Sequence, residues 1–300
     1  MPELLDKSLL LVTGKGGVGR TTVAAALGLK AAGEGRRTIV CEVAEQERLP
    51  TLFGGTQAGH HERELAPGLF GISIDPERAK EEWLRYQLGS ALAGLLGHSR
   101  IFQYLTAAAP GLTELVTVGK VWELAQLQRK TAKASPYDLV IVDSPATGHG
   151  VAMLRAPRTF SEVARVGPIH RQAATIHRFL TDPAATGVLT VALPEEMPVT
   201  ETLELGGRLR EEMGMRIDRI VVNQLLPERF SGAEAGRLES VDGRGSPAIR
   251  AALSEYRRAR LQRSQLRRLR RAAEAPVTTL PFLFATDFGQ RQLEALAARL

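Results

Sequence analysis

The sequence predicts a doubly wound α/β fold with a mostly parallel sheet and a small helical annex. Short apolar runs, typical of buried strands, alternate along the chain with longer stretches of helical character. A glycine-rich turn at residues 13–22 follows the first of these runs and opens the first helix. A continuous apolar run at 139–142 ends in an aspartate, as expected of a central parallel strand that ends at a polar site.

The glycine-rich turn predicts a phosphate-binding loop of the P-loop NTPase type. It follows a strand expected at 9–12 and precedes a helix expected at 21–32, which ends at Gly33. Glycines let successive N–H groups turn toward a phosphate, and the helix N-terminus adds positive partial charge. The pattern is a Walker A loop in which Arg20 replaces the usual lysine. The residues expected to contact nucleotide are Gly14, Gly16, Gly17, Val18, Gly19, Thr21 and Thr22, and Arg20 takes the catalytic position of the lysine.

A second interpretation of the same loop is a dinucleotide site. The G-x-G-x-x-G pattern at 14–19 satisfies the dinucleotide fingerprint, with Glu42 at the end of the next strand as the ribose-binding acid. The pair Thr21 and Thr22 favours a magnesium-bound triphosphate, because a hydroxyl at this position can ligate the ion. The sequence therefore favours a triphosphate over a dinucleotide-dependent oxidoreductase.

Composition restricts the class of protein. The chain has 300 residues, of which 44% are hydrophobic, enough for one sizeable core. No apolar run approaches the length of a membrane span, and the N-terminus carries no secretory signal, so we expect a cytoplasmic protein. Cys41 is the only cysteine, so no disulfide or cysteine zinc site can form within the chain, and zinc is not expected.

The remaining elements follow from apolar runs and from glycine and proline breaks. Further strands are expected at 36–41, 69–75, 137–143, 187–193, 217–223 and 277–280. Helices are expected at 79–105, 112–130, 151–183 with breaks at Pro157 and Gly167, 198–213, 249–275 and 290–300. The interval 227–247 is rich in Gly, Ser, Glu and Arg and is typical of a mobile loop. We expect one domain over 1–300, with helical insertions at about 76–130 and 151–183.

Four motifs resemble the anion-transporting ATPase family, which includes arsenical-pump-driving and tail-anchored-protein-targeting ATPases. Lys15 matches the early lysine of their deviant Walker A loop, and Asp-Ser-Pro-Ala-Thr-Gly-His-Gly at 143–150 is similar to their switch II. The strand end at 223–224 resembles their adenine-reading strand, and 281–284 resembles the proline-apolar loop that packs on the base. The adenine contacts that this resemblance implies are Asn223, Gln224, Pro281 and Phe282.

The resemblance implies a dimeric ATPase that binds ATP or ADP with Mg²⁺, in which Lys15 reaches the phosphates of the partner subunit. Asp143 and Thr21 would hold the ion, partly through water. The switch I acid of the family falls on Ala44, with acidic residues on either side but out of register. The switch residues implied are Glu42, Ala44, Glu45, Thr147, Gly148 and His149.

Arg20 and Ala44 depart from the family pattern, so we expect weak hydrolysis by the isolated chain. The chain is then either a homodimeric switch or a non-hydrolysing regulatory subunit that pairs with a related ATPase. One cysteine cannot build a thiolate site for arsenite, and the segment 151–183 holds only Met153 where a client groove would be rich in methionine. The sequence does not identify a cargo or a membrane partner.

Residues 249–275 form a basic helix with nine arginines and two glutamates. Such a helix could contact nucleic acid or an anionic membrane. A packed helix with a solvated arginine face is the preferred interpretation, because charge runs usually serve solubility. Nucleic acid is therefore not expected as a partner.

Overall fold

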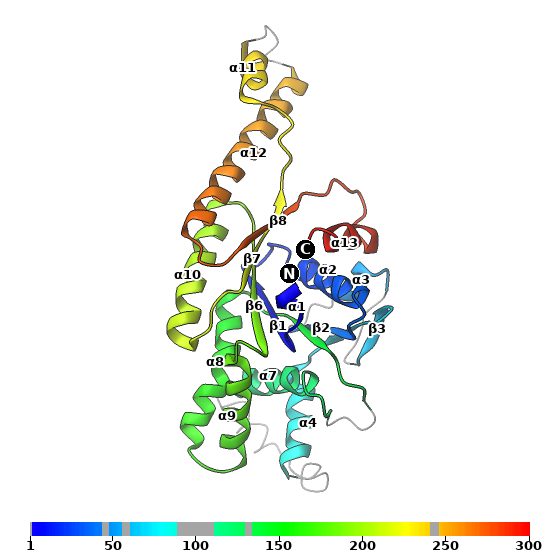
Figure 1. The fold of residues 1–300 in the computed structure, drawn as a ribbon, viewed down its shortest axis with the longest axis vertical. Helices are drawn as coiled ribbons and strands as arrows, with labels where there is room; N and C mark the ends of the chain where they lie inside the picture. Colours follow the sequence, from blue (N-terminus) through cyan, green and yellow to red (C-terminus); the bar gives the residue numbers. More distant parts are fainter. Residues whose placement is uncertain (1, 44–47, 56–60, 89–110, 130–133, 241–245) are drawn as a thin grey trace.

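A sheet of eight strands with helices on both faces forms the body of the protein (Figure 1). The computed structural model describes residues 2–43, 48–55, 61–88, 111–129, 134–240 and 246–300. The strand order is β3-β4-β2-β5-β1-β6-β7-β8, and every neighbouring pair is parallel except β3 with β4. The predicted doubly wound, mostly parallel α/β fold is confirmed.

The strands are β1 (Leu9–Gly14), β2 (Thr38–Glu42), β3 (Arg63–Ala66), β4 (Leu69–Ser73), β5 (Leu139–Asp143), β6 (Thr186–Ala192), β7 (Arg219–Leu225) and β8 (Val277–Pro281). Helices before β5 are α1 (Pro2–Leu5), α2 (Arg20–Gly33), α3 (Leu49–Leu52), α4 (Pro76–Leu88) and α7 (Leu112–Leu124). Those after β5 are α8 (Thr147–Ala164), α9 (Pro168–Thr181), α10 (Glu196–Met213), α11 (Gly232–Ser240), α12 (Pro247–Ala272) and α13 (Gln290–Ala297). No helix in the described ranges is both long and apolar enough to span a membrane.

Alternate residues of the central strands enter different cores. Leu9 and Leu11 of β1 pack with residues of α7, α8, α9 and α10 on one face of the sheet. Leu10 and Val12 pack with α2 and α13 on the other face. This period of two is what a strand buried on both faces requires, and it explains the continuous apolar runs of the sequence. A smaller cluster joins α12 to α10 and β7 through Leu266 and Leu269.

Parallel pairing brings the glycine-rich loop and the segment after Asp143 to one edge of the sheet. Val12 of β1 pairs with Asp143 of β5, and Gly14 pairs with Val191 of β6. The carboxyl ends of β1, β5, β6 and β7 therefore meet there, where doubly wound sheets bind ligands. α11 and the first half of α12 project from the body as an arm (Figure 1).

The predicted loop at 227–247 is wrong in part, because α11 occupies Gly232–Ser240. Ser231 and Glu234 form its N-terminal cap: Ser231 N donates to Glu234 Oε2 at 2.7 Å, and Glu234 N donates to Ser231 Oγ at 3.2 Å. A Ser-x-x-Glu sequence is a known start signal for helices. The signal was overlooked because the surrounding residues are mostly polar, as in a loop.

Other elements also differ from the prediction. Pro157 lies inside α8 and does not end it, whereas the break before Pro168 is present. α7 ends at Leu124, short of the expected 130, and the antiparallel edge strand β3 was not predicted. The second part of the helix expected at 79–105, residues 89–105, lies outside the described residues.

The packing of α2 on the sheet depends on Gly28. A Cβ at Gly28 would lie 2.7 Å from Leu69 Cδ1 and 2.9 Å from Val40 Cγ2, and both neighbours are fully buried in strands. Gly28→Ala should lower the free energy of unfolding by about 1–3 kcal/mol through overpacking. In urea unfolding, the control Gly207→Ala on α10 should instead be neutral or stabilising by up to about 1 kcal/mol, since its Cβ meets no atom within 4 Å. Equal stabilisation by both variants would contradict this account.

Candidate functional site

The glycine-rich loop leaves β1 and enters α2 in a conformation that glycine alone accommodates at two positions. Gly14 has φ +147°, and a Cβ there would lie 2.3 Å from the carbonyl oxygen of Val191. Gly19 has φ +90°, and a Cβ there would lie 2.4 Å from Asn223 Nδ2. The loop thus lies directly against the ends of β6 and β7.

The N-terminus of α2 is open to an anion. Gly19 is its N-cap residue, and within the described ranges no side chain caps it. The loop is exposed at Gly16 and Gly17, while Val18 is buried and Thr22 is half-buried. Uncapped N–H groups at a helix start, together with the helix dipole, favour a phosphate group.

Thr21 and Asp143 come together at the start of α2. Thr21 Oγ1 donates to Asp143 Oδ2 at 2.5 Å, and Asp143 is the last residue of the central strand β5. Asp143 Oδ1 is buried and has no hydrogen-bond partner in the part of the chain that the structure describes. Burial raises the pKa of Asp143, although the Thr21 hydrogen bond and the charges of Arg20 and Arg48 act in the opposite direction.

Arg20 is directed at the segment after β5. Its Nη1 donates to the carbonyl oxygen of Ser144, whose own N–H donates to Val12 O at 3.0 Å. Burial lowers the pKa of Arg20, with the charge of Asp143 opposing that shift and the charge of Arg48 adding to it. Arg20 therefore connects the start of α2 to the segment after β5 that the sequence predicts to begin switch II.

Lys15, the other cation of the loop, contacts α10. Its Nζ lies 2.5 Å from Glu201 Oε1, and both side chains are partly exposed. Sequence reasoning missed Glu201, because nothing in the local sequence connects residues that are 186 positions apart.

The expected switch residues lie on both sides of this site. Glu42 is buried, and its Oε1 accepts the N–H groups of Arg48 at 2.9 Å and Leu49 at 3.0 Å. This carboxylate oxygen therefore serves the start of α3, which weakens its assignment as a ribose-binding acid. Ala44 and Glu45 lie outside the described residues.

The motif Thr147, Gly148 and His149 forms the first turn of α8, with Gly148 and His149 exposed. α8 begins directly after the Ser144 segment that Arg20 contacts. The predicted switch II is thus placed between β5 and a helix start, beside the glycine-rich loop.

The four residues expected to contact adenine lie on adjacent strand ends, since Leu225 of β7 pairs with Pro281 of β8. Asn223 Nδ2 donates to Val18 O at 3.0 Å, and Asn223 Oδ1 accepts from Gln224 N at 2.9 Å. The amide thereby holds the glycine-rich loop. Phe282 N donates to Leu225 O at 2.9 Å.

A residue of α12 also supports this strand end. Gln262 Oε1 accepts from Leu226 N at 2.8 Å, and its Nε2 donates to Gln224 O at 3.4 Å. Gln224 has φ +58°, a conformation uncommon for a residue with a side chain. Sequence reasoning missed Gln262, because it lies within a helix that was notable only for its arginines.

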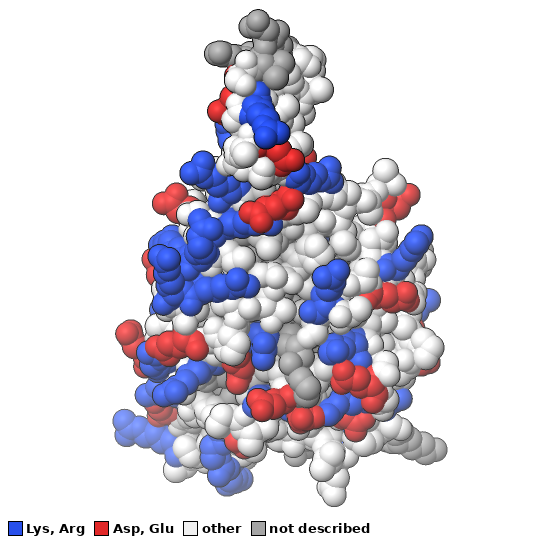
Figure 2. Space-filling model, turned by 45° about the horizontal axis from the view of Figure 1, so that its top comes forward, with Lys and Arg blue, Asp and Glu red and all other residues white. Residues whose placement is uncertain are grey.

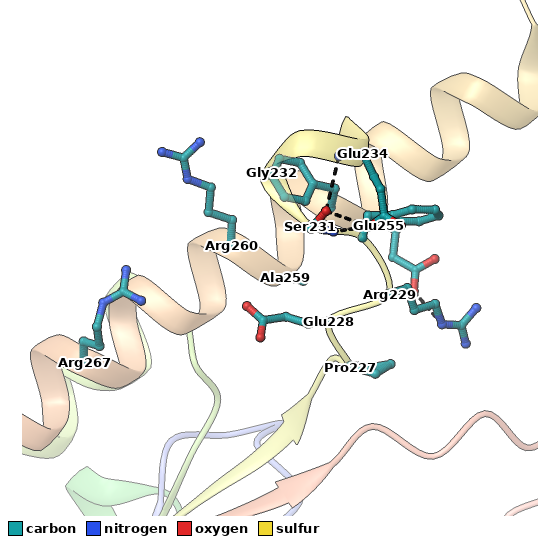
Figure 3. Close-up of a pocket in the computed structure, with 12 residues that line it drawn as sticks. Pro227, Glu228, Arg229, Ser231, Gly232, Glu234, Glu255, Ala259, Arg260 and Arg267 are labelled. Atoms are coloured by element: carbon teal, nitrogen blue, oxygen red, sulfur yellow. Dashed lines mark hydrogen bonds and ion pairs between the residues drawn. The ribbon is translucent and has the colours of Figure 1, made fainter. Parts of the chain in front are cut away.

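A separate cavity of about 620 Å³ lies between the 227–232 segment, α11 and α12 (Figure 3). Its lining includes Arg260 and Arg267, which both project from α12, and an Arg229–Glu255 ion pair of 3.1 Å. No residue of the glycine-rich loop lines it. The cavity is thus distinct from the candidate site at the glycine-rich loop.

Comparison with known proteins places these features in a family. The family profile for anion-transporting ATPases matches residues 7–172 and 162–242. The chain is 34% identical over 226 residues to the ATPase BagA of Mycobacterium tuberculosis, covering 73% of this chain and 65% of that protein.

Two more distant relatives carry names of the same kind. The ATPase GET3C of Arabidopsis thaliana is 24% identical over 280 residues, which cover 77% of this chain and 70% of that protein. The arsenical pump-driving ATPase of Acidiphilium multivorum is 26% identical over 238 residues, which cover 73% of this chain and 40% of that protein. The chain thus spans less than two thirds of the length of several relatives. Because the family profile covers most of the sequence, this chain belongs to the anion-transporting ATPase family.

Proposed function

We propose that the chain is an adenine-nucleotide-binding ATPase that acts as a dimeric switch and hydrolyses ATP weakly on its own. The observation that carries the proposal is the contact of Thr21 with Asp143 at an uncapped helix start, directly after the glycine-rich loop. Phosphate oxygens suit the exposed N–H groups there. The adenine would lie toward the ends of β7 and β8, at Asn223, Gln224, Pro281 and Phe282.

The donor set at the start of α2 fits Mg²⁺. Asp143 Oδ1 is a buried carboxylate oxygen without a hydrogen-bond partner in the described ranges, and Thr21 adds a hydroxyl oxygen beside it. Hard oxygen ligands are what this ion prefers, often with part of its water shell retained. When bound, Mg²⁺ would neutralise phosphate charge. Asp143 and Thr21 would orient it, and the loop N–H groups would hold the phosphates.

Weak hydrolysis follows from the placement of Arg20. Its guanidinium is bonded to the Ser144 carbonyl, whereas a lysine ammonium is a compact charge that can sit between phosphates. Ala44 at the switch I position offers no acid to orient water. Positions 20 and 44, which are expected to act in the transition state, are altered, whereas the loop that binds the ground-state nucleotide is kept. Such a change lowers kcat more than it lowers nucleotide affinity.

The proposed dimer assigns Lys15 to the phosphates of a second subunit, either another copy or a related ATPase. The names of the relatives include ATPases of arsenical pumps, but one buried cysteine cannot supply an arsenite site in this chain. We propose that the whole of 1–300 acts as one nucleotide-dependent unit.

Asp143→Asn should separate metal-assisted binding from binding of the nucleotide alone. We expect ATP affinity in Mg²⁺ to fall at least about tenfold, because a neutral amide ligates the ion poorly, with little change in EDTA. Isothermal calorimetry measures both. The matched control is Asp138→Asn, before the other end of β5, where the carboxylate accepts from Arg37 N and is exposed. An equal loss with and without Mg²⁺ would assign Asp143 a purely structural role.

Arg20→Lys should raise steady-state ATP turnover. A restored lysine supplies the compact charge between phosphates, and loss of one such group typically costs about a hundredfold in kcat. Wild type should therefore turn over slowly despite tight binding, and Lys15→Ala should abolish what remains. Robust wild-type turnover that Arg20→Lys does not increase would refute the weak-site assignment.

The arginine face of α12 should not affect nucleotide binding. Residues 267–271 carry four exposed arginines around Leu269, which is buried and packs in the smaller core. Figure 2 shows basic side chains along the side formed by α10 and α12. The test variant replaces with Gln the residues Arg267, Arg268, Arg270 and Arg271. ATP affinity should stay within about twofold of wild type, since screening weakens distant exposed charges. Salt-sensitive binding of wild type to DNA or anionic liposomes, lost in the variant, would instead reveal a docking face.

A further inference from the structure

Lys15, which lies between the first two glycines of the loop, forms an ion pair within the chain. Lys15 Nζ and Glu201 Oε1 are 2.5 Å apart, with side-chain exposures of 35% and 31%. Lys15 lies in the loop after β1, whereas Glu201 lies in the second turn of α10, the helix after β6. The ion pair therefore links the phosphate loop to a neighbouring helix at the same edge of the sheet.

The position of Glu201 is set by packing and not by the ion pair. β6 pairs with β1 up to Gly14, so α10 starts beside the loop. Val199 is fully buried, and Thr202 is buried with its Oγ1 donating to Pro198 O at 2.8 Å. Because core residues flank Glu201 on both sides, its carboxylate stays near the loop whether or not Lys15 is present.

We propose that Glu201 is a positioning residue for Lys15, which keeps the ammonium on the chain's own α10 until phosphates of a second subunit replace the carboxylate. The assignment rests on the proposed function, in which Lys15 acts across a dimer. In the free chain Lys15 is directed along its own surface, and dimerisation with nucleotide exchanges the Glu201 carboxylate for phosphate.

The strength of the contact suits such an exchange. An ion pair between partly exposed groups contributes little net free energy, because water screens it and both side chains lose freedom. A triphosphate carries more charge and accepts several charge-assisted hydrogen bonds. Phosphate can therefore displace Glu201. Neutralising the carboxylate should strengthen nucleotide-dependent dimerisation by about two- to fivefold.

The first experiment measures the contact itself, without any dimer. The purified chain is treated briefly with acetic anhydride, and acetylation of Lys15 is followed by mass spectrometry. Glu201→Gln should raise the Lys15 rate about two- to fivefold by releasing the amine. The control is Glu204→Gln on the same helix, where the carboxylate is exposed and has no ion pair in the described ranges. A Lys15 rate unchanged by Glu201→Gln would overturn the assignment.

The second experiment is a double-mutant cycle read by analytical ultracentrifugation with ATP and Mg²⁺. Glu201→Gln should lower the dimer Kd, and it should have no effect in a Lys15→Ala background. A merely structural role for Glu201 would shift the Kd equally in both backgrounds and would overturn the assignment. Equal melting temperatures of all variants exclude misfolding as the cause.

The outcomes separate this assignment from the proposed function. If wild type dimerises with nucleotide and Lys15→Ala dimerises with a measurably higher Kd, while Glu201→Gln matches wild type, only the role of Glu201 fails. If wild type shows no nucleotide-dependent dimer, or Lys15→Ala dimerises as well as wild type, the cross-dimer role of Lys15 fails and the exchange fails with it.

Discussion

The contact between Thr21 and Asp143 joins the two elements on which the site depends. Asp143 ends β5, which lies between β1 and β2 at the centre of the sheet, and Thr21 lies in the first turn of α2. Every other feature of the site is placed relative to this pair. The glycine-rich loop spans the gap between β1 and α2, and Arg20 extends from the same turn to the residue after Asp143. A shift of α2 along the sheet would therefore disturb the glycine-rich loop and the segment after Asp143 together.

This arrangement buries the charged groups of Asp143 and Arg20, and their desolvation costs free energy. Burial raises the pKa of Asp143 and lowers the pKa of Arg20, so each charged form is disfavoured by desolvation and partly restored by the other group. Asp143 Oδ1 gains no hydrogen bond in the described ranges. Apolar residues at these positions would avoid the desolvation penalty. Buried groups with perturbed pKa values cluster where chemistry occurs, and the unpartnered oxygen is the atom that a cation would use.

Local patterns in the sequence were sufficient to predict the parts of the structure that depend on a few consecutive residues. Gly14 and Gly19 mark the loop, and Asp143 marks the end of the central strand, because each is required by its immediate backbone. The cap at Ser231 was equally local, but it was overlooked in a polar segment. Glu201 and Gln262 could not be predicted, since their contacts depend on which strands become neighbours. Strand order is set by the packing of the whole chain and leaves no signal near either residue.

Both cations of the glycine-rich loop have partners within the chain. Arg20 is bonded to a backbone carbonyl in a half-buried setting, and Lys15 is paired with a carboxylate in a more exposed one. The buried contact is less screened, so it should persist when phosphate binds, whereas the exposed ion pair is easily replaced. The two cations are then suited to different roles. In the proposed function, Arg20 links α2 to the segment expected to be switch II, and Lys15 exchanges its carboxylate partner for phosphate. On this proposal, the arginine at position 20 costs catalytic charge, and in return it links the glycine-rich loop to the segment expected to respond to hydrolysis.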